Sequence, residues 1–226
     1  MIVAIQQPEH LPWIGFFDKM IKCDAYVFLD NVQYKKRYFE NRNKIINRDG
    51  QCQWITVPVI SKGKYHQKIS DVIIDNASNW QRKYLENIKR AYTKTIGFKD
   101  NFLMIEKIIR SDFKYLINLN IALINYYRNY YQISTPCYFA SELIDDHMNG
   151  SDLILQLCKS TKATKYLSGP DGRNYLKTDT FDTENIEIEY HDYQHPVYEQ
   201  LYCKTFSSHM SICDYTFNNG ENLWQY

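Results

Sequence analysis

The chain has 226 residues, enough for one large domain to bury a substantial hydrophobic core. Hydrophobic residues make up 44% of the sequence and charged residues 23%, which are ordinary globular proportions and exclude a disordered chain or a fibrous repeat. The net charge of +1 excludes a global field that would attract DNA or an anionic membrane. Because the apolar stretches are short and no secretory signal opens the chain, we expect a cytoplasmic protein without a membrane span.

In chain order, the apolar periodicity predicts strands and helices that alternate. We expect a strand at residues 2–6, a short helix at 15–22, strands at 25–29, 54–59 and 72–74, helices at 78–93, 99–110, 113–131 and 151–159, and strands at 165–167 and 186–190. Serines are the predicted N-caps of the helices that begin near residues 78 and 151.

This alternation predicts an α/β fold with a mostly parallel sheet flanked by helices. The segment 78–132 differs, because it holds successive helices without a convincing strand, and we expect it to be a helical insertion. Since no linker or repeat divides the sequence, residues 1–226 are predicted to form a single domain, with 78–132 as a candidate helical subdomain.

The cysteines do not have the spacing of a metal site. All six lie far apart in the sequence, and no pair has the spacing of a zinc knuckle. We therefore expect reduced thiols that pack as small core residues, and no metal.

The loop after the first predicted strand contains Gln6, Gln7, two prolines and a glycine, and it leads directly into a helix. The backbone N–H groups at such a helix start favour phosphate, and amides that follow an apolar strand are candidates for ligand binding, Gln7 in particular. The alternative is a stiff connection with solvated polar side chains.

The loop after the second strand, residues 30–44, is strongly basic. Arginine forks match pyrophosphate oxygens, lysines add point charges, and the interleaved aromatic rings offer stacking faces. The alternative is a solvated basic surface. The candidate binding residues in this loop are Asp30, Gln33, Lys35, Lys36, Arg37, Asn41, Arg42 and Lys44.

Two further loops follow predicted strands near the end of the sequence. The loop from Ser168 contains Gly169, which permits close backbone approach to a ligand, and Arg173, which can clamp an oxyanion. In the last loop, His195 is the best candidate for a general base, with Asp192 to orient it. His10 is the second candidate, and a structural histidine is the alternative in each case.

Because parallel strands end at one edge of a sheet, these four loops are expected to surround one cleft, marked by Gln7, Asp30, Gly169 and His195.

Together the loops resemble the WbqC-like family. The pattern of that family begins with a strand, Gln-Pro, Leu-Pro-Trp and Gly-Phe-Phe, and His10 stands where the pattern has tyrosine. The matching segments, which together extend over nearly the whole chain, are residues 7–20, 28–37, 41–44, 54–59, 166–170 and 195–198.

The resemblance implies a protein of O-antigen and surface-polysaccharide (lipopolysaccharide) gene clusters. It implies a transferase that moves an acyl group, of the aminoacyl type such as glycyl, onto the amino group of a nucleotide-linked sugar. The expected co-substrate is an activated acyl or aminoacyl donor, with a tRNA or a carrier protein as candidate carriers; no bound cofactor is implied. The alternatives are a nucleotidyl-transfer or adenylate-forming enzyme, which would depend on Mg²⁺, and a non-catalytic subunit that binds sugar nucleotides.

Overall fold

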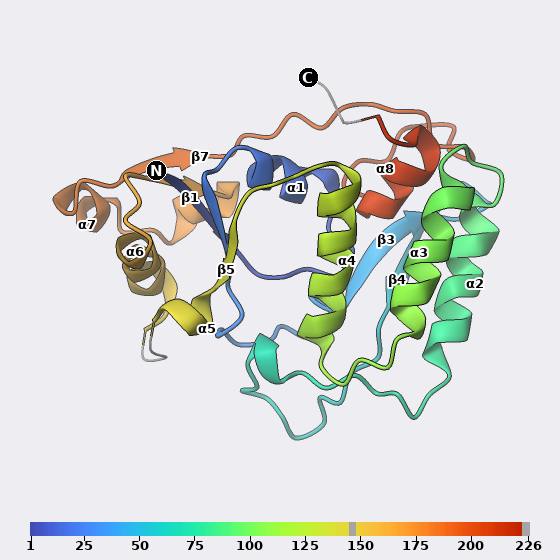
Figure 1. Cartoon of the computed structure of the whole chain (residues 1–226), viewed down its shortest axis with the longest axis horizontal. Helices are drawn as coiled ribbons and strands as arrows, with labels where there is room; N and C mark the ends of the chain where they lie inside the picture. The colour runs from blue at the N-terminus through green and yellow to red at the C-terminus, as the bar shows by residue number, and fades with distance from the viewer. Residues whose placement is uncertain (145–147, 223–226) are drawn as a thin grey trace. The chain divides into compact units, whose positions relative to one another are not determined.

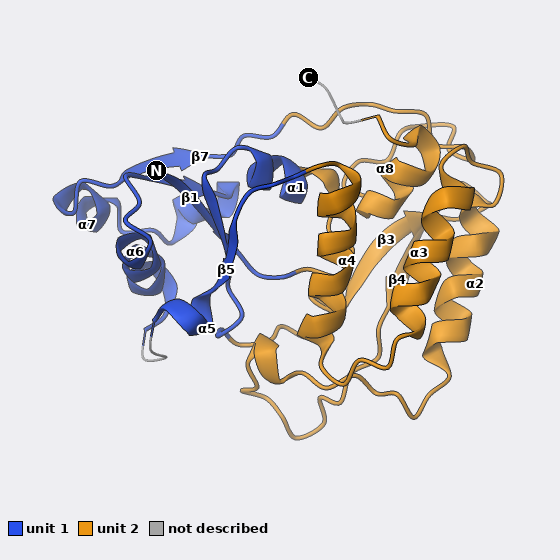
Figure 2. Ribbon diagram, viewed as in Figure 1, with its two compact units in different colours: residues 1–8, 16–32, 133–193 blue, residues 9–15, 33–132, 194–226 orange. Residues whose placement is uncertain are grey.

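The computed structural model describes residues 1–144 and 148–222 (Figure 1). The chain divides into two compact units, each assembled from several chain segments (Figure 2). Unit 1 comprises residues 1–8, 16–32 and 133–193, and unit 2 comprises residues 9–15, 33–132 and 194–226.

Unit 1 contains a five-stranded sheet with the order β5-β2-β1-β6-β7, in which every neighbouring pair is parallel. The strands are β1 (Ile2–Gln6), β2 (Ala25–Phe28), β5 (Cys137–Phe139), β6 (Lys165–Ser168) and β7 (Glu187–Tyr190). This arrangement confirms the predicted α/β class with a mostly parallel sheet.

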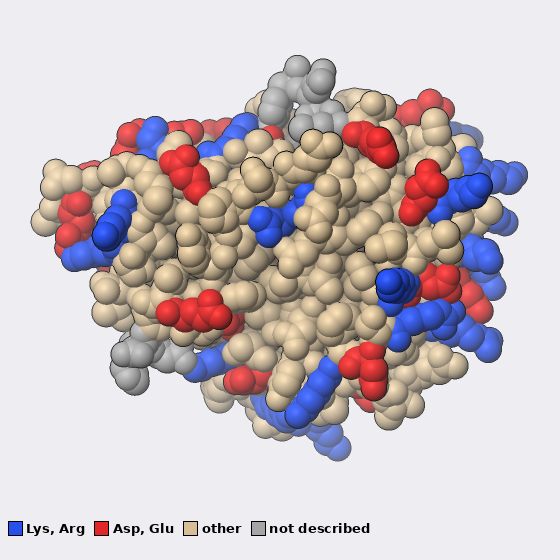
Figure 3. Space-filling model, in the orientation of Figure 1, with Lys and Arg blue, Asp and Glu red and all other residues tan. Residues whose placement is uncertain are grey.

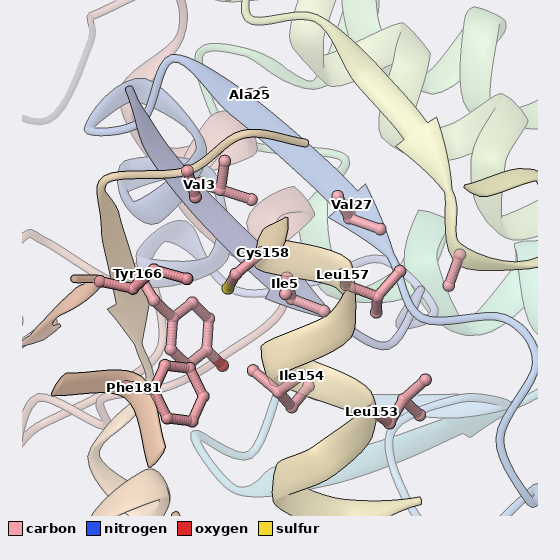
Figure 4. Close-up of a cluster of buried hydrophobic side chains, with 13 residues drawn as sticks. Val3, Ile5, Ala25, Val27, Leu153, Ile154, Leu157, Cys158, Tyr166 and Phe181 are labelled. Carbon is pink, nitrogen blue, oxygen red and sulfur yellow. The ribbon is translucent and has the colours of Figure 1, made fainter. Parts of the chain in front are cut away.

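The central strands are apolar at successive positions because both faces of the sheet are covered. On one face, Val3 and Val27 pack with Leu157 of helix α6 (Gly150–Ser160), as Figure 4 shows. On the other face, Tyr26 contacts Phe16 of helix α1 (Ile14–Ile21), with their ring centroids 5.4 Å apart. Burying each such side chain contributes about 1.5–3 kcal/mol, so this two-sided core fixes the sheet.

Shorter elements complete unit 1. Helix α5 (Ala140–Leu143) follows β5, the 3-10 helix η2 (Pro170–Asn174) follows β6, and helix α7 (Thr178–Thr183) precedes β7. Phe181 of α7 is fully buried and stacks on Tyr166, which anchors α7 to the same core.

Unit 2 combines a two-stranded antiparallel ribbon with a set of helices. The ribbon pairs β3 (Arg42–Ile46) with β4 (Cys52–Thr56). The helices are α2 (Trp80–Tyr92), α3 (Phe98–Arg110), α4 (Leu116–Tyr130) and α8 (Ile212–Asn219), with the 3-10 helix η1 (Ile69–Asp71) between β4 and α2. Helices α2, α3 and α4 are the helical insertion expected at 78–132.

A buried carboxylate ties the last helix of unit 2 to the rest of that unit. Asp214 of α8 accepts hydrogen bonds from the hydroxyls of Tyr92 and Tyr198, at 2.5 and 2.7 Å, and from the amide of Gln200 at 2.8 Å. Three donors compensate the desolvation of this fully buried group. The network therefore connects α2, α8 and the segment between residues 194 and 211.

Several local expectations were wrong. The strand expected at 54–59 is β4, which begins two residues earlier, at Cys52, and ends at Thr56. Its partner β3 begins at Arg42, inside the segment 30–44 that was expected to be a loop. In place of the strand expected at 72–74, Ile73 and Ile74 form isolated bridges, and β5 was not predicted. The Ser78 hydroxyl donates to the carbonyl of Asp75, and the Ser151 hydroxyl accepts the N–H of Lys177, so neither serine caps its helix.

Among the described residues, no helix is long and apolar enough to cross a membrane. On the face shown in Figure 3, acidic and basic side chains are intermixed, as expected from the small net charge.

Candidate functional site

The carboxyl edge of the unit 1 sheet brings together three of the loops that were expected to bind a ligand. Gln7 follows β1, Asp30 follows β2 and Gly169 follows β6, and these three strands are parallel neighbours. The chain moves outward from β1 to β2 and later crosses to β6 on the other side of β1. The carboxyl ends of β1 and β6 therefore form a topological switch point, where open α/β sheets bind ligands.

The polar side-chain atoms of Asp30 and Ser168 form hydrogen bonds with other residues at this edge of the sheet. The Asp30 carboxylate, which is buried, accepts the backbone N–H and the hydroxyl of Ser141 at 3.0 and 2.6 Å. The Ser168 hydroxyl, also buried, donates to the carbonyl of Gly169 at 3.0 Å. These contacts hold the loop backbones in place. Gly169 itself has nothing within 4 Å of the position of a Cβ atom, so its edge is open.

Arg173 lies beside the same edge. Its guanidinium binds both oxygens of the Asp192 carboxylate, at 3.2 and 3.0 Å, and lies 4.1 Å from the ring centroid of Tyr190. Asp192 was expected to orient His195, and it is instead the ion-pair partner of Arg173. Both side chains are largely exposed, so solvent screens this pair and it contributes little to stability.

A buried histidine–carboxylate pair that the sequence did not indicate lies in unit 1. The Nε2 atom of His191, which follows β7, is 2.6 Å from an Asp18 carboxylate oxygen on α1. The side chains are only 7% and 3% exposed.

Residues 33–44 of the basic loop belong to unit 2, where residues 33–36 line a pocket of about 420 Å³ together with the segment around Tyr65. The two walls are joined by the bridge between Gln33 and Lys68 and by the Gln33 side-chain amide, which donates to the Tyr65 carbonyl at 2.7 Å. Lys36 lies 4.9 Å from the Tyr65 ring centroid. The lining combines cations with aromatic rings and consists of Gln33, Tyr34, Lys35, Lys36, Lys64 and Tyr65.

The remaining cations of the basic loop have other contacts. Arg42 donates to the carbonyl of Arg37, which has a positive φ of 59°, and its guanidinium lies 4.0 Å from the ring centroid of Trp54. Lys44 lies 5.3 Å from the same ring. Arg42 and Lys44 are two residues apart on β3 and therefore share a face of the ribbon. Arg42 thus braces the turn at Arg37, whereas Lys35 and Lys36 face the pocket.

Two asparagines of this region stabilise the backbone. The Asn41 amide donates to the carbonyl of Val57 at 2.8 Å. The Asn43 amide donates to the carbonyls of His10 and Leu11, at 3.2 and 2.8 Å. Leu11 has a positive φ of 43°, which is uncommon for a residue with a side chain, and the amide helps hold it there. Asn41, a predicted binding residue, is therefore part of the scaffold.

His195 is held by contacts on both ring nitrogens. Nδ1 lies 2.8 Å from the Pro196 carbonyl, to which it donates, and Nε2 accepts the backbone N–H of His209 at 3.2 Å. The ring also stacks on Trp13, with centroids 5.9 Å apart. Burial lowers the pKa of His195, so the neutral ring is favoured. This geometry differs from that of an available base and favours a role in positioning Trp13 and the loop.

His10 is fully buried, and both of its ring nitrogens have partners. Nδ1 lies 2.9 Å from the Asn120 side-chain oxygen, and Nε2 lies 2.7 Å from the hydroxyl of Tyr84. Since the Asn120 amide nitrogen donates to the carbonyl of Glu40, its oxygen is left to accept the His10 proton. Burial lowers the pKa of His10 to about 4. A neutral imidazole with partners on both ring nitrogens supports the core, and this geometry favours the structural alternative for His10.

Metal ligands and thiols of the described residues are the last candidates for chemistry. Within residues 1–144 and 148–222, no group of three or more His, Cys, Asp or Glu side chains could hold a metal ion. The six cysteines are free thiols, and burial raises the pKa of Cys23, Cys158 and Cys213 to about 12, which disfavours the nucleophilic thiolate.

Comparison with known proteins identifies the family. The model of the WbqC-like protein family matches residues 7–226. The chain belongs to the WbqC-like protein family. This WbqC-like protein is 34% identical over 228 residues, covering 99% of the chain and 96% of the relative, to "Uncharacterized protein Rv1507c" of Mycobacterium tuberculosis (strain ATCC 25618 / H37Rv). No solved structure matches it.

In this WbqC-like protein, sequence reasoning missed parts of both candidate sites. Lys64 and Tyr65 follow a lysine and a glycine in the run Lys62-Gly63-Lys64-Tyr65, and that basic, aromatic run could have been noticed as a second anion-binding segment. Asp18 and His191 gave no such signal, because they are 173 residues apart.

Proposed function

We propose that this WbqC-like protein is a transferase that adds an acyl group, of the aminoacyl type such as glycyl, to the amino group of a nucleotide-linked sugar in surface-polysaccharide biosynthesis. The observation that carries the proposal is the basic pocket of unit 2, lined by Lys35, Lys36 and Lys64 with two tyrosines. Ammonium groups neutralise a diphosphate, and a tyrosine face can stack on a base or pack against a sugar.

The net charge of the whole chain supports a local site rather than a general attraction to anions. With a net charge of +1, an anionic substrate is attracted by the pocket and not by the protein as a whole. No carboxylate is among the lining residues, and the buried carboxyl group of Glu40 interacts with Lys35, so a diphosphate would add negative charge mainly beside Lys36 and Lys64.

Ligand binding can be tested by thermal shift with inorganic pyrophosphate, UDP and dTDP. A ligand at ten times its Kd stabilises the folded protein by about 1.4 kcal/mol. Removal of a charged hydrogen bond costs about 1.5–3 kcal/mol, so Lys64→Ala is expected to weaken binding of UDP roughly tenfold or more. Lys62→Ala is the matched control, because Lys62 is exposed on the same loop and outside the lining. Equal affinity of the two variants would refute the pocket as the diphosphate site.

Transfer itself can be tested with nucleotide-linked amino sugars and labelled glycyl donors, either glycyl-tRNA or a glycyl thioester of a carrier protein. The expected product carries one additional glycyl group on the sugar nitrogen. Binding of the sugar nucleotide without any transfer would favour a non-catalytic binding subunit.

The switch point of the unit 1 sheet supports a second candidate, a nucleotidyl-transfer or adenylate-forming enzyme, since nucleotides bind at such points in open α/β sheets. This reaction would need ATP or another nucleoside triphosphate and Mg²⁺. Release of pyrophosphate that depends on Mg²⁺ would distinguish it from acyl transfer.

A further inference from the structure

Asp18 and His191 form a buried pair at the carboxyl edge of the unit 1 sheet. The carboxylate and imidazole atoms are 2.6 Å apart, and Lys22 lies 3.0 Å from the same carboxylate oxygen. This environment fixes the orientation of the imidazole ring.

The fold explains why these distant residues meet. Tyr166 of β6 belongs to the cluster that faces α6, and its register partner on β7 is Ile188. Side chains alternate along a strand, so Tyr190 faces the same side as Ile188, and His191 faces the opposite side, where α1 carries Asp18. The N–H of His191 donates to the carbonyl of Ser168 at 2.8 Å, which extends the strand pairing to this residue.

The contact with Asp18 also sets the proton positions on the ring. A carboxylate accepts a hydrogen bond, so Nε2 of His191 carries a proton, and in the neutral form of the ring Nδ1 carries the lone pair. Among the residues that the structure describes, Nδ1 has no hydrogen-bond partner. This distinguishes His191 from His10 and His195, whose two nitrogens are both engaged.

A purely structural role explains the pair less well. Burying the Asp18 carboxylate costs desolvation energy that a hydrogen bond from the ring and a nearby ammonium group often fail to repay, so such a buried charge is a weak contributor to stability. The position of His191 beside the loops of Ser168 and Arg173, at the edge where α/β sheets bind ligands, is instead the position expected of a functional group.

We infer that His191 is the general base and acid of an acyl-transfer site at this edge, and that Asp18 is its positioning residue. The inference rests on the proposed function for the identity of the acceptor, an amine. Nδ1 of His191 takes a proton from the amine of the acceptor. At the same time the amine nitrogen forms a bond to the acyl carbon of an activated ester or thioester. The C–O or C–S bond then breaks, and the imidazolium returns the proton to the departing oxygen or sulfur.

Carbethoxylation of the wild-type protein by diethyl pyrocarbonate, resolved by mass spectrometry of peptides, tests whether Nδ1 is available. We expect His191 to be acylated at least tenfold faster than His10, although both rings are buried. Equal, slow modification of His191 and His10 would show that Nδ1 is closed, and would overturn the inference without any variant having to fold.

Cleavage of p-nitrophenyl acetate, a small activated acyl ester, tests the chemistry. General acid–base catalysis contributes about 10²–10⁴-fold, so His191→Gln is expected to lower kcat/KM for this ester by about that factor. His66→Gln is the matched control, because His66 is exposed and belongs to unit 2, whereas His191 belongs to unit 1. A folded His191→Gln variant with the wild-type rate would refute the role of His191.

The role of Asp18 is tested by rescue. Asp18→Asn is expected to lower the ester rate and the carbethoxylation rate of His191 together, whereas Asp18→Glu restores part of both. Loss of stability without a change in either rate would reduce Asp18 to a structural group.

The two proposals can fail separately. One outcome is that ester cleavage depends on His191 but the protein transfers nothing to a nucleotide-linked amino sugar. That outcome would support His191 as the base and refute the proposed acceptor. Transfer to such a sugar at the wild-type rate by His191→Gln would support the proposed function and refute the base.

Discussion

Several buried polar side chains of unit 2 use their hydrogen bonds to hold the backbone of that unit. The Asn43 amide holds the carbonyls of His10 and Leu11, and Asn120 connects His10 to the carbonyl of Glu40. These side chains are buried, so an unpaired amide or imidazole would cost about 1–3 kcal/mol. Residue identity at such positions is therefore explained by folding, before any ligand is considered.

The lowered pKa of His10 predicts a specific loss of stability in acid. The unfolded chain binds a proton below pH 6.5, whereas the folded protein resists it down to about pH 4. Folding stability is thus present above pH 6.5 and is lost as the pH falls toward 4. With about 1.4 kcal/mol per pKa unit, this contribution is roughly 3 kcal/mol.

His10→Gln removes the titration and keeps one donor and one acceptor. Urea unfolding at pH 7 and pH 4.5 should show a larger stability difference between the two conditions for wild type than for the variant. Identical pH dependence of the two proteins would contradict the assigned environment.

Glu40 predicts the opposite pH dependence. Burial raises the pKa of this carboxyl group above its ordinary value. As the pH rises through the unfolded value, the unfolded chain ionises first, so the wild type loses stability toward neutral pH. Glu40→Gln is expected to be more stable than wild type at pH 8 and to lose this advantage near pH 4. Chemical denaturation across this range provides the measurement, and a variant less stable than wild type at pH 8 would exclude the explanation.

Among the secondary-structure elements, the sequence best predicts the strands whose burial requires an apolar pattern. β1, β2, β6 and β7 were expected within two residues of their observed ends; β1 and β2 are apolar at successive positions because both of their faces are covered, whereas the edge strand β7 alternates exposed glutamates with half-buried residues. β5 escaped notice because Cys137–Phe139 is short and only partly buried. β3 was not predicted because it begins with three polar residues, Arg42, Asn43 and Lys44. Arg42 and Lys44 lie on one face of the ribbon, and the Asn43 amide makes buried hydrogen bonds to the backbone.

The turn into α1 depends on a missing side chain. A Cβ atom at Gly15 would lie 2.2 Å from the ring of Trp13, which also stacks on His195 and His209. Because this ring also contacts the rings of His195 and His209, Gly15→Ala is expected to cost about 1–3 kcal/mol, measured as a lower midpoint of urea unfolding.

Gly169→Ala is the matched control, since nothing lies within 4 Å of its Cβ position. Its stability should equal that of wild type. A neutral Gly15→Ala variant would show that Trp13 moves aside freely and that the stack on His195 does not constrain the turn.

For the whole molecule, contacts between residues far apart in the sequence are the feature that the sequence predicts least well. Parallel pairing placed the loops of Gln7, Asp30 and Gly169 at one edge, as the strand order required. Which side chains meet depends instead on which face of a strand or helix each one occupies. The local sequence pattern does not encode the pairing of such faces between distant segments. His195 and Asp192 were paired because they are close in the sequence, whereas the structure joins Asp192 to Arg173 and His191 to Asp18.

The discontinuous units also predict how the chain responds to truncation. Residues 194–226 give unit 2 the buried helix α8, including Ile212 and Phe217, and the carboxylate of Asp214 that binds Tyr92. All five strands of the unit 1 sheet precede residue 194. A chain that ends at Tyr193 is therefore expected to lose the cooperative fold of unit 2 while it keeps the strands of unit 1.

Urea unfolding followed by circular dichroism measures this, because the slope m scales with the surface exposed on unfolding. The truncated chain should show a clearly smaller m. Full-length Asp214→Asn is the control: the amide retains part of the hydrogen-bond network, so the midpoint should fall while m stays constant. An unchanged midpoint and slope for the chain that ends at Tyr193 would mean that unit 2 folds without its last segment, against the burial of α8.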